Sequence, residues 1–385
     1  MAFRTRPAAT SAPISAPTSG PALALALACA APAGAGAAPA LPEIAPPRVE
    51  ALADGLEHPW SIAFLPDGRE LVTERAGRLR IVDRGRVSAP VANVPPVLAE
   101  GQGGLLEVAP HPDHADNGWL YLTLAHGTPA RNALRLVRAR LEAGALVDLE
   151  VLFTARPWKD TPVHFGGRLA FLPDGTLLLA VGGGFDFRED AQRLDNHFGK
   201  IVRLADDGSV PADNPFVDES GALPEIWSYG HRNPQGIVFD PATGAVFAHE
   251  HGPAGGDEVN RIEPGANYGW PIATRGRDYS GAAISPFEDY AGTVAPLVDW
   301  TPSIAPAGLA LGSGSAFPAL EGEFLVAALK SRELVRVRLG AEGEPVGQAT
   351  LLSGRGRLRD VRVAPDGSLR VLVDAADGSV LRLAP

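Results

Sequence analysis

Clusters of polar residues stand just before apolar, strand-like stretches at several places in this sequence. The clearest is GHRNPQG, residues 230–236, in which His231, Arg232 and Asn233 come directly before an apolar run. Similar stretches are GQGG (101–104), VHFGGR (163–168), PSIAPAG (302–308) and RGRLRD (355–360). Each one alone is typical of a solvated turn. If the fold brought them together, they would form one site containing a histidine and several cations.

Cations in or beside these stretches indicate the charge of a ligand. They are Arg232, Lys330, Arg357 and Arg359, and an extended strand would turn the last two to the same side. The chain as a whole is acidic, with a formal net charge of −11. A cationic cluster in an acidic protein favours a small polyanion with several carboxylates or phosphates. The alternative is that each cation pairs with a nearby acid at the surface.

His164 is the candidate general base. Phe165, Gly166 and Gly167 follow it, and the two glycines leave room for a ligand. Imidazole can accept a proton near neutral pH. The alternative is a histidine whose ring is bonded to a carbonyl within a turn.

The stretch AHEHGPAGGDEVN, residues 248–260, has features of a cation-binding loop. His249 and His251 would share a strand face and could form a zinc pair, but no third ligand stands at a suitable spacing. A Gly-Pro loop can instead turn carbonyls inward, while Asp257 and Glu258 supply carboxylates. Such mixed oxygen ligands favour Ca²⁺.

A repeated hairpin pattern must position these stretches. IAFLPDGRELVTE, LAFLPDGTLLLAVG and VRVAPDGSLRVLVD each join two apolar strands through a Pro-Asp-Gly turn, and degenerate copies begin at Leu106, Ile237 and Leu309. Six hairpins after residue 40 give units of roughly 57 residues, near the size of a four-stranded propeller blade. We predict an all-β fold, a six-bladed β-propeller of four-stranded antiparallel sheets. The polar stretches would then meet at one mouth of the central channel.

The first 40 residues differ from the rest. Arg4 and Arg6 precede the apolar run ALALALACA (22–30) and a tract of small residues, which is typical of a secretory signal and too short to span a membrane. A disordered tail and lipid attachment at Cys29 are the alternatives. We predict a leader over 1–40, a catalytic propeller over 41–385, and a periplasmic or secreted protein.

Several classes of function are disfavoured. Cys29 is the only cysteine, so the predicted domain has no disulfide and no cysteine nucleophile. An acidic chain is a poor partner for nucleic acid or an anionic membrane. The glycine-rich and catalytic motifs of nicotinamide enzymes, P-loop proteins, serine hydrolases and zinc proteases are absent from the sequence.

From about Val49 to the C-terminus, the chain resembles the soluble quinoprotein aldose sugar dehydrogenases of the glucose/sorbosone dehydrogenase family. GQGG, HFGGRL, GHRNPQG, EHGPxGGDE, NYGWP, LK and RxRD occur in the family's order, and this ordered set is specific although each motif alone is weak. The resemblance implies a six-bladed propeller that uses pyrroloquinoline quinone (PQQ) and Ca²⁺. It also implies oxidation of an aldose at C1 to the lactone, with hydride passing to the cofactor.

The resemblance also implies roles for particular residues. His164 matches the general base, and Gln102 matches a residue beside substrate and cofactor. The residues that match cofactor contacts are Arg232, Asn233, Tyr279, Lys330, Arg357 and Arg359. Gly252 and Pro253 match carbonyl ligands of the cofactor-site Ca²⁺, and Glu258 and Tyr268 match a second, structural Ca²⁺ site. The three carboxylates of PQQ would account for the cations.

Two positions depart from the family pattern. Val163 stands where some members have an aspartate before the base, and Trp300 is displaced by one position relative to the loop TPSIAP. Both lie near the expected sugar, so we expect a range of aldoses broader than glucose. A Ca²⁺-dependent propeller hydrolase of the lactonase kind and a non-catalytic propeller binding module are the alternative functions. The electron acceptor, and the choice between monomer and homodimer, are open.

Overall fold

The computed structural model describes residues 41–340 and 343–385. The predicted leader over 1–40, including Cys29, lies outside these residues and stays a prediction. Among the helices of the described residues, none is long and apolar enough to cross a membrane.

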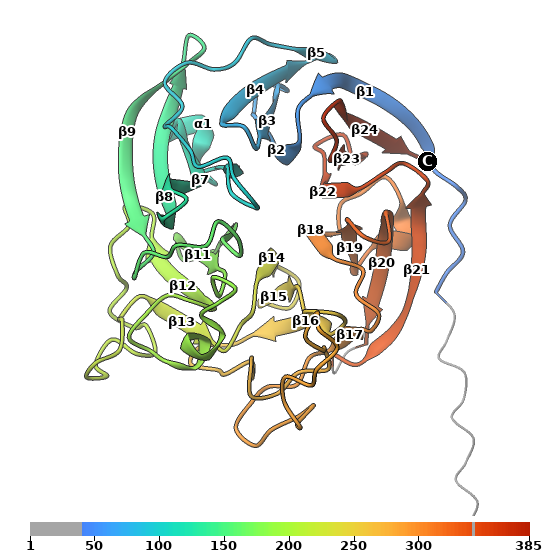
Figure 1. The fold of residues 1–385 in the computed structure, drawn as a ribbon. Coiled ribbons are helices and arrows are strands. Elements are labelled where there is room, and N and C mark those ends of the chain that lie inside the picture. The colour runs from blue at the N-terminus through green and yellow to red at the C-terminus, as the bar shows by residue number, and fades with distance from the viewer. Residues whose placement is uncertain (1–40, 341–342) are drawn as a thin grey trace, which may run out of the picture. The chain divides into compact units, whose positions relative to one another are not determined.

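Six antiparallel sheets of four strands each surround a central axis (Figure 1). This confirms the predicted six-bladed β-propeller. The first three blades are β2 (Pro59–Phe64), β3 (Glu70–Glu74), β4 (Arg78–Asp83) and β5 (Arg86–Val87); β6 (Leu105–Pro110), β7 (Trp119–Thr128), β8 (Arg131–Glu142) and β9 (Ala145–Thr154); and β10 (Gly166–Phe171), β11 (Thr176–Val181), β12 (Lys200–Ala205) and β13 (Ile226–Tyr229).

The remaining blades follow the same order from the axis outward. They are β14 (Pro234–Asp240), β15 (Ala245–Glu250), β16 (Asp257–Ile262) and β17 (Val298–Trp300); β18 (Pro306–Leu311), β19 (Glu323–Ala328), β20 (Glu333–Leu339) and β21 (Pro345–Ser353); and β22 (Leu358–Val363), β23 (Leu369–Val373), β24 (Gly378–Ala384) and β1 (Arg48–Leu56). Three short helices, α1 (His114–Asn117), η1 (Arg188–Gln192) and η2 (Pro318–Leu320), lie in connections between strands.

The six predicted hairpins are the two inner strands of each blade. In the first blade, for example, Ile62 of β2 pairs with Val72 of β3 across the Pro-Asp-Gly turn. Gly68 and Gly175, the last residues of two such turns, have φ of +87° and +83°, which glycine adopts without steric cost. Turn chemistry and alternating apolar residues therefore explain why these segments form hairpins.

The last blade joins the two ends of the described chain. Its outer strand is β1, which pairs antiparallel with β24, so that Val49 lies opposite Leu383 and Leu56 opposite Gly378. The repeat pattern predicted the hairpin at Val361 but did not show that an N-terminal strand completes this sheet. This pairing closes the ring.

The apolar core lies between neighbouring blades. Leu106 and Tyr121 of the second blade belong to the same buried cluster as Leu169 and Leu179 of the third. Apolar residues of the fifth and sixth blades form a second cluster of this kind. The hydrophobic effect thus holds blade against blade, since each sheet buries its faces against its neighbours.

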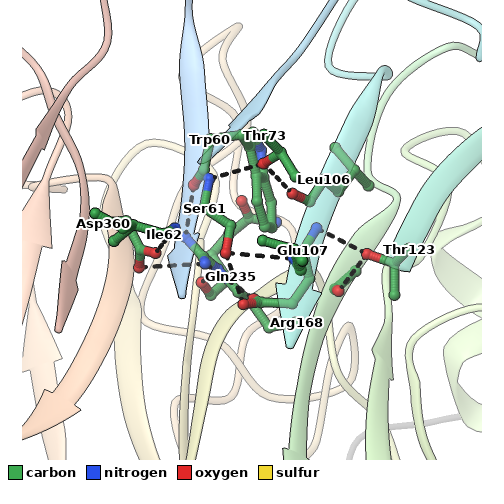
Figure 2. Close-up of polar contacts among 12 residues, drawn as sticks. Trp60, Ser61, Ile62, Thr73, Leu106, Glu107, Thr123, Arg168, Gln235 and Asp360 are labelled. Carbon is green, nitrogen blue, oxygen red and sulfur yellow. Dashed lines mark hydrogen bonds and ion pairs between the residues drawn. The ribbon is translucent and has the colours of Figure 1, made fainter. Parts of the chain in front are cut away.

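A buried polar network crosses the axis, with Arg168 of β10 at its centre (Figure 2). The Arg168 guanidinium lies 2.9 Å from a carboxylate oxygen of Glu107 on β6 and 3.2 Å from one of Asp360 on β22. It also donates to the main-chain carbonyls of Gln235, Trp60 and Arg359 at 3.1, 3.4 and 3.2 Å.

The inner strand of the fifth blade, β18, also reaches this network. A Cβ atom at Gly308 of β18 would stand 2.4 Å from a carboxylate oxygen of Asp360, so only glycine allows this approach. Arg362 completes the charge balance by binding Glu107 at 2.8 Å and Asp360 at 3.3 Å. The inner strands of all six blades therefore meet one set of buried charges.

Replacement of Arg168 should destabilise the fold severely. In Arg168→Met, Glu107 and Asp360 would lose their central cation while buried, which costs about 3–5 kcal/mol of unfolding free energy. Urea unfolding at pH 7 measures this loss. Arg48→Gln is the control, because the Arg48–Glu50 pair is exposed and should be worth less than about 1 kcal/mol. Equal stability of Arg168→Met and the native chain would contradict the central role of this network.

Candidate active site

A cavity of about 290 Å³ opens where the loops before the inner strands converge. All five polar stretches identified in the sequence contribute to its lining, as the propeller symmetry predicted. Trp60, which precedes the first hairpin in the same way, is a sixth contributor. The lining residues are Trp60, Arg75, Gly101, Gln102, Phe165, Gly166, Gln235, His251, Ala305, Leu329, Arg357 and Arg359.

The axial network lies directly beneath this cavity. The main-chain carbonyls of Trp60, Gln235 and Arg359 that bind Arg168 belong to residues that line the cavity. The positions of these residues are therefore coupled to the buried charges at the axis.

Arg357 and Arg359 place positive charge on one wall of the cavity. Arg359 is buried and lies 2.9 Å from Asp374, whereas Arg357 is half-exposed and lies 3.6 Å from the same carboxylate. Burial favours a raised pKa for Asp374, but Arg359, His58 and Arg357 outweigh it and lower that pKa to about 2. One carboxylate thus serves two arginines, which leaves net positive charge for an anionic ligand.

His164 is buried beside the cavity, between Val163 and the lining residue Phe165. Its main-chain N–H donates to Oε1 of Gln102 at 2.8 Å, and its ring meets Phe185 edge to face at 5.2 Å. Burial lowers the pKa of His164 well below its usual range, and nearby Arg232 adds to this effect. The imidazole is consequently neutral at physiological pH, which is the form that a general base requires, while burial and Arg232 disfavour its protonated form.

Arg232 belongs to the polar stretch that comes just before β14. Its guanidinium donates to the carbonyls of His251 and Gly252 at 2.9 and 2.7 Å, and lies 3.5 Å from the hydroxyl of Tyr279. Tyr279 is 65% exposed. Arg232 and Tyr279 also line a smaller hollow of about 120 Å³ together with Pro253.

Two other predicted residues occupy different environments. Asn233 is buried, and its side-chain oxygen accepts a hydrogen bond from Gln235 at 3.3 Å. Lys330 is exposed and follows Leu329, which lines the cavity. The structure therefore places Lys330 next to the cavity wall along the chain, without including it in the lining.

The residues predicted for the cofactor-site Ca²⁺ lie in the loop after β15. The Gly252 carbonyl already accepts a hydrogen bond from a cationic guanidinium, which shows that it is accessible to positive charge. The expected contribution of the Asp257 carboxylate to this cation site stays a prediction. Its carboxylate accepts from the N–H groups of Gly252 and Ala305 and from the Ser303 hydroxyl, so it braces the loop. A cation here fits the backbone carbonyls and oxygens of a bound ligand.

The second predicted Ca²⁺ site lies among carboxylates on adjacent strands. Glu250, Glu258 and Asp299 are directly opposite one another across β15, β16 and β17. Burial, reinforced by Glu250, raises the pKa of Glu258 well above its usual range. A side-chain oxygen of Asp299 is buried without a hydrogen-bond partner. Like charges opposite one another are unfavourable, but in the described part of the chain these three carboxylates do not form a group placed to hold a metal ion. The predicted Ca²⁺ site therefore stays a prediction.

Tyr268 lines the same small pocket as Glu258. Its hydroxyl donates to the Arg261 carbonyl at 2.6 Å and accepts from the Glu263 N–H at 2.9 Å. The hydroxyl is thus occupied by main-chain hydrogen bonds, and the predicted Ca²⁺ contact of Tyr268 would have to come from its main-chain carbonyl.

The zinc alternative lacks support in the described residues. No group of three His, Cys, Asp or Glu side chains in that part of the chain is placed to hold a metal. His251 instead lines the cavity and bonds the Pro306 carbonyl at 2.7 Å. His231 is bonded to Glu250 and Ser228, at 2.9 Å in each case.

Trp300 and Val163 are the two residues that the family resemblance places near the sugar. Trp300 is buried on β17 and donates from its indole to Gln348 at 2.7 Å. Trp300 thus packs away from the cavity. Val163 contributes its carbonyl to a hydrogen bond with Lys159 at 2.6 Å.

Comparisons with known proteins agree with the fold. A family model described as Glucose / Sorbosone dehydrogenase matches residues 56–382. The aldose sugar dehydrogenase YliI of Escherichia coli (strain K12) is 43% identical over 347 residues, which cover 88% of this chain and 93% of that protein. A crystal structure of a glucose dehydrogenase is 45% identical, with a TM-score of 0.85, and the match covers 88% of this chain and 100% of that one. The PQQ-bound aldose sugar dehydrogenase from Streptomyces coelicolor is 30% identical, with a TM-score of 0.71 and the same shares.

Removal of the Asp374 charge should destabilise the cavity wall. Because the folded state lowers the pKa of Asp374 from 3.8 to about 2, its carboxylate contributes about 2–3 kcal/mol at neutral pH. Asp374→Asn should lose this amount in urea unfolding at pH 7. The difference from the native chain should shrink as pH falls from about 4 toward 2, where the carboxyl of both states becomes protonated.

The control for this variant is Asp148→Asn. Asp148 pairs with Arg140 at the surface, so its loss should cost less than about 1 kcal/mol. Equal effects of the two substitutions would contradict the structural role assigned to Asp374.

Proposed function

Because the chain belongs to the glucose/sorbosone dehydrogenase family, we propose that it is a quinoprotein that oxidises aldose sugars at C1 to the lactone. Family membership supports a sugar dehydrogenase, and the finer assignments rest on the residues of the site. These assignments are supported by one observation: Arg357, Arg359, Gln102 and the loop of His164 meet at the same cavity.

The cations of the cavity suit the carboxylates of PQQ. Arg357 and Arg359 would bind one side of the cofactor, because charged donors form strong hydrogen bonds with carboxylates. Arg232, Asn233, Tyr279 and Lys330 would provide the other contacts. When bound, PQQ supplies the two-electron acceptor, and Ca²⁺ polarises the carbonyl that receives hydride.

The carbonyls of Gly252 and Pro253 would hold that Ca²⁺. Since the Arg232 guanidinium occupies the Gly252 carbonyl here, binding of the cation requires this guanidinium to turn away. The turn would release Arg232 for an anionic ligand. A second Ca²⁺ held by Glu258 and the Tyr268 carbonyl would neutralise the carboxylate row of the fourth blade.

His164 would act as the general base. As the C1–H bond breaks and its electron pair leaves toward the acceptor, the C1 hydroxyl proton passes to the neutral imidazole. The C1–O bond then becomes the lactone carbonyl, and the imidazolium later releases its proton to water. Gln102 would hold the base in place through the His164 N–H.

The composition of the cavity disfavours the other functions considered. Among the described residues, those lining the cavity include arginine, glutamine and histidine but no carboxylate. A Ca²⁺-dependent lactonase would need carboxylate ligands at this mouth. A non-catalytic binding module would need no neutral, buried histidine beside the cations.

The cofactors should be required for activity. We expect the PQQ-free protein to reduce an artificial dye with glucose only after PQQ and Ca²⁺ are both added, because PQQ would supply the two-electron acceptor. Dye reduction with each addition alone, and after EDTA treatment, measures this dependence. Full activity of the PQQ-free protein in EDTA would exclude the proposed chemistry.

His164→Gln should impair the chemical step and spare cofactor binding. Loss of a general base lowers the rate by about 10²–10⁴-fold. The measurement is single-turnover reduction of bound PQQ by glucose, read from absorbance, alongside a PQQ titration. His114→Gln, on helix α1, is the matched control and should behave as the native enzyme. A rate within about threefold of native would show that another group is the base.

A further inference from the structure

Lys159 lies in the segment that leads from β9 to β10 and carries His164. It forms an isolated antiparallel bridge with Asn132 of β8. The Lys159 N–H donates to the Asn132 carbonyl at 2.9 Å, and the Asn132 N–H donates to the Lys159 carbonyl at 2.8 Å. The backbone of Lys159 is therefore anchored to the long hairpin of the second blade.

The side chain of Lys159 points into the loop of His164 and is 5% exposed. Its ammonium donates to the carbonyls of Thr161 and Val163 and lies 3.7 Å from the centre of the Phe165 ring. One cation thus contacts both residues that adjoin His164 in the chain.

Burial makes the charged form of the Lys159 amine costly, so that only part of it is protonated at neutral pH and all of it at clearly lower pH. In the part of the chain that the structure describes, no carboxylate forms an ion pair with it, and burial lowers the pKa of Lys159 to about 7. A buried charge without a counter-ion is unfavourable. In the acid range, where an imidazole takes up its proton, the Lys159 amine is charged and lies against both neighbours of His164.

The backbone of His164 needs support from its surroundings. His164 has φ of +52°, a left-handed conformation that is unfavourable for a residue with a Cβ atom. Gln102 fixes its N–H group, and Lys159 fixes the carbonyl just before it. A Cβ at Gly182 would lie 2.3 Å from the His164 carbonyl, so the other side of the residue is also closely packed.

We propose that Lys159 is a positioning residue for proton transfer to His164. Its ammonium holds the peptide groups around the base, and its positive charge disfavours a second positive charge on the imidazole. Arg232 and Lys159 are the cations that act on that imidazole, and His251 contributes only when it is protonated, because burial lowers its pKa to about 3. The inference rests on the proposed role of His164 as the base.

Two substitutions separate the charge from the hydrogen bonds. Lys159→Gln retains a donor without the charge, and Lys159→Met retains the apolar stem alone. In Lys159→Met, displacement of the base should slow single-turnover reduction of PQQ by about 10–100-fold, while PQQ affinity stays within about threefold. In both variants the acid limb of the rate–pH profile should move to higher pH, since the imidazolium forms more easily once the neighbouring charge is gone.

A measurement without cofactor provides an independent readout. NMR titration of the His164 imidazole in the PQQ-free protein should show a higher midpoint in Lys159→Gln than in the native chain. Lys200→Met is the matched control. Lys200 is another buried lysine, bound to the carbonyls of Asp190, Ala191 and Phe198. Its loss should lower stability without moving the rate–pH profile or the His164 midpoint.

The outcomes distinguish this inference from the proposed function. If His164→Gln is slow but the His164 midpoint and acid limb in Lys159→Gln match those of the native enzyme, Lys159 is only structural and the inference is overturned. Should Lys159→Met fail to fold, Lys159→Gln decides the question by the same two readouts. If His164→Gln turns over like the native enzyme, the base assignment fails and the inference fails with it.

Discussion

A buried guanidinium at the propeller axis is the interaction on which the arrangement of the site depends. Glu107, Asp360 and several carbonyls surround Arg168 there and compensate its guanidinium for the loss of water. These partners belong to different blades, so their contacts with Arg168 fix the inner strands relative to one another. Three of the carbonyls belong to residues whose side chains or backbone line the cavity above. The positions of these cavity-lining residues thus depend on the hydrogen bonds that their carbonyls accept from the buried Arg168 guanidinium.

The same balance of buried charge recurs at the cavity itself. Asp374 shares one negative charge between Arg357 and Arg359, and Glu250 binds His231 while accepting from the N–H of Arg232. Each acid holds a cation in place without cancelling the positive character of the wall. Preorganised donors of this kind need little rearrangement when an anionic ligand arrives.

Local patterns predicted much of this molecule. Pro-Asp-Gly turns and alternating apolar residues identified six hairpins, and their repetition placed the stretches of Gln102, His164 and Arg359 at equivalent positions that do meet. These local patterns could not predict which acidic residues would pair with the cations of the cavity. Asp374 was not recognised because its partners are defined by packing, and the hydrogen bonds that Asp257 accepts from the N–H groups of Gly252 and Ala305 were not foreseen. The spacing of residues in a sequence does not specify the direction of a side chain. It could therefore not show that the Asp257 carboxylate points toward the N–H groups of its own loop.

The pairing of β1 with β24 has a consequence for biosynthesis. The sheet that closes the ring contains the first and last described strands, so it cannot form until translation has reached β24. Residues from both the first and the sixth blade, Trp60 and Arg359, line the cavity. A nascent chain emerging from the ribosome therefore lacks a finished pocket, and any small molecule that depends on that pocket has to be acquired after synthesis is complete.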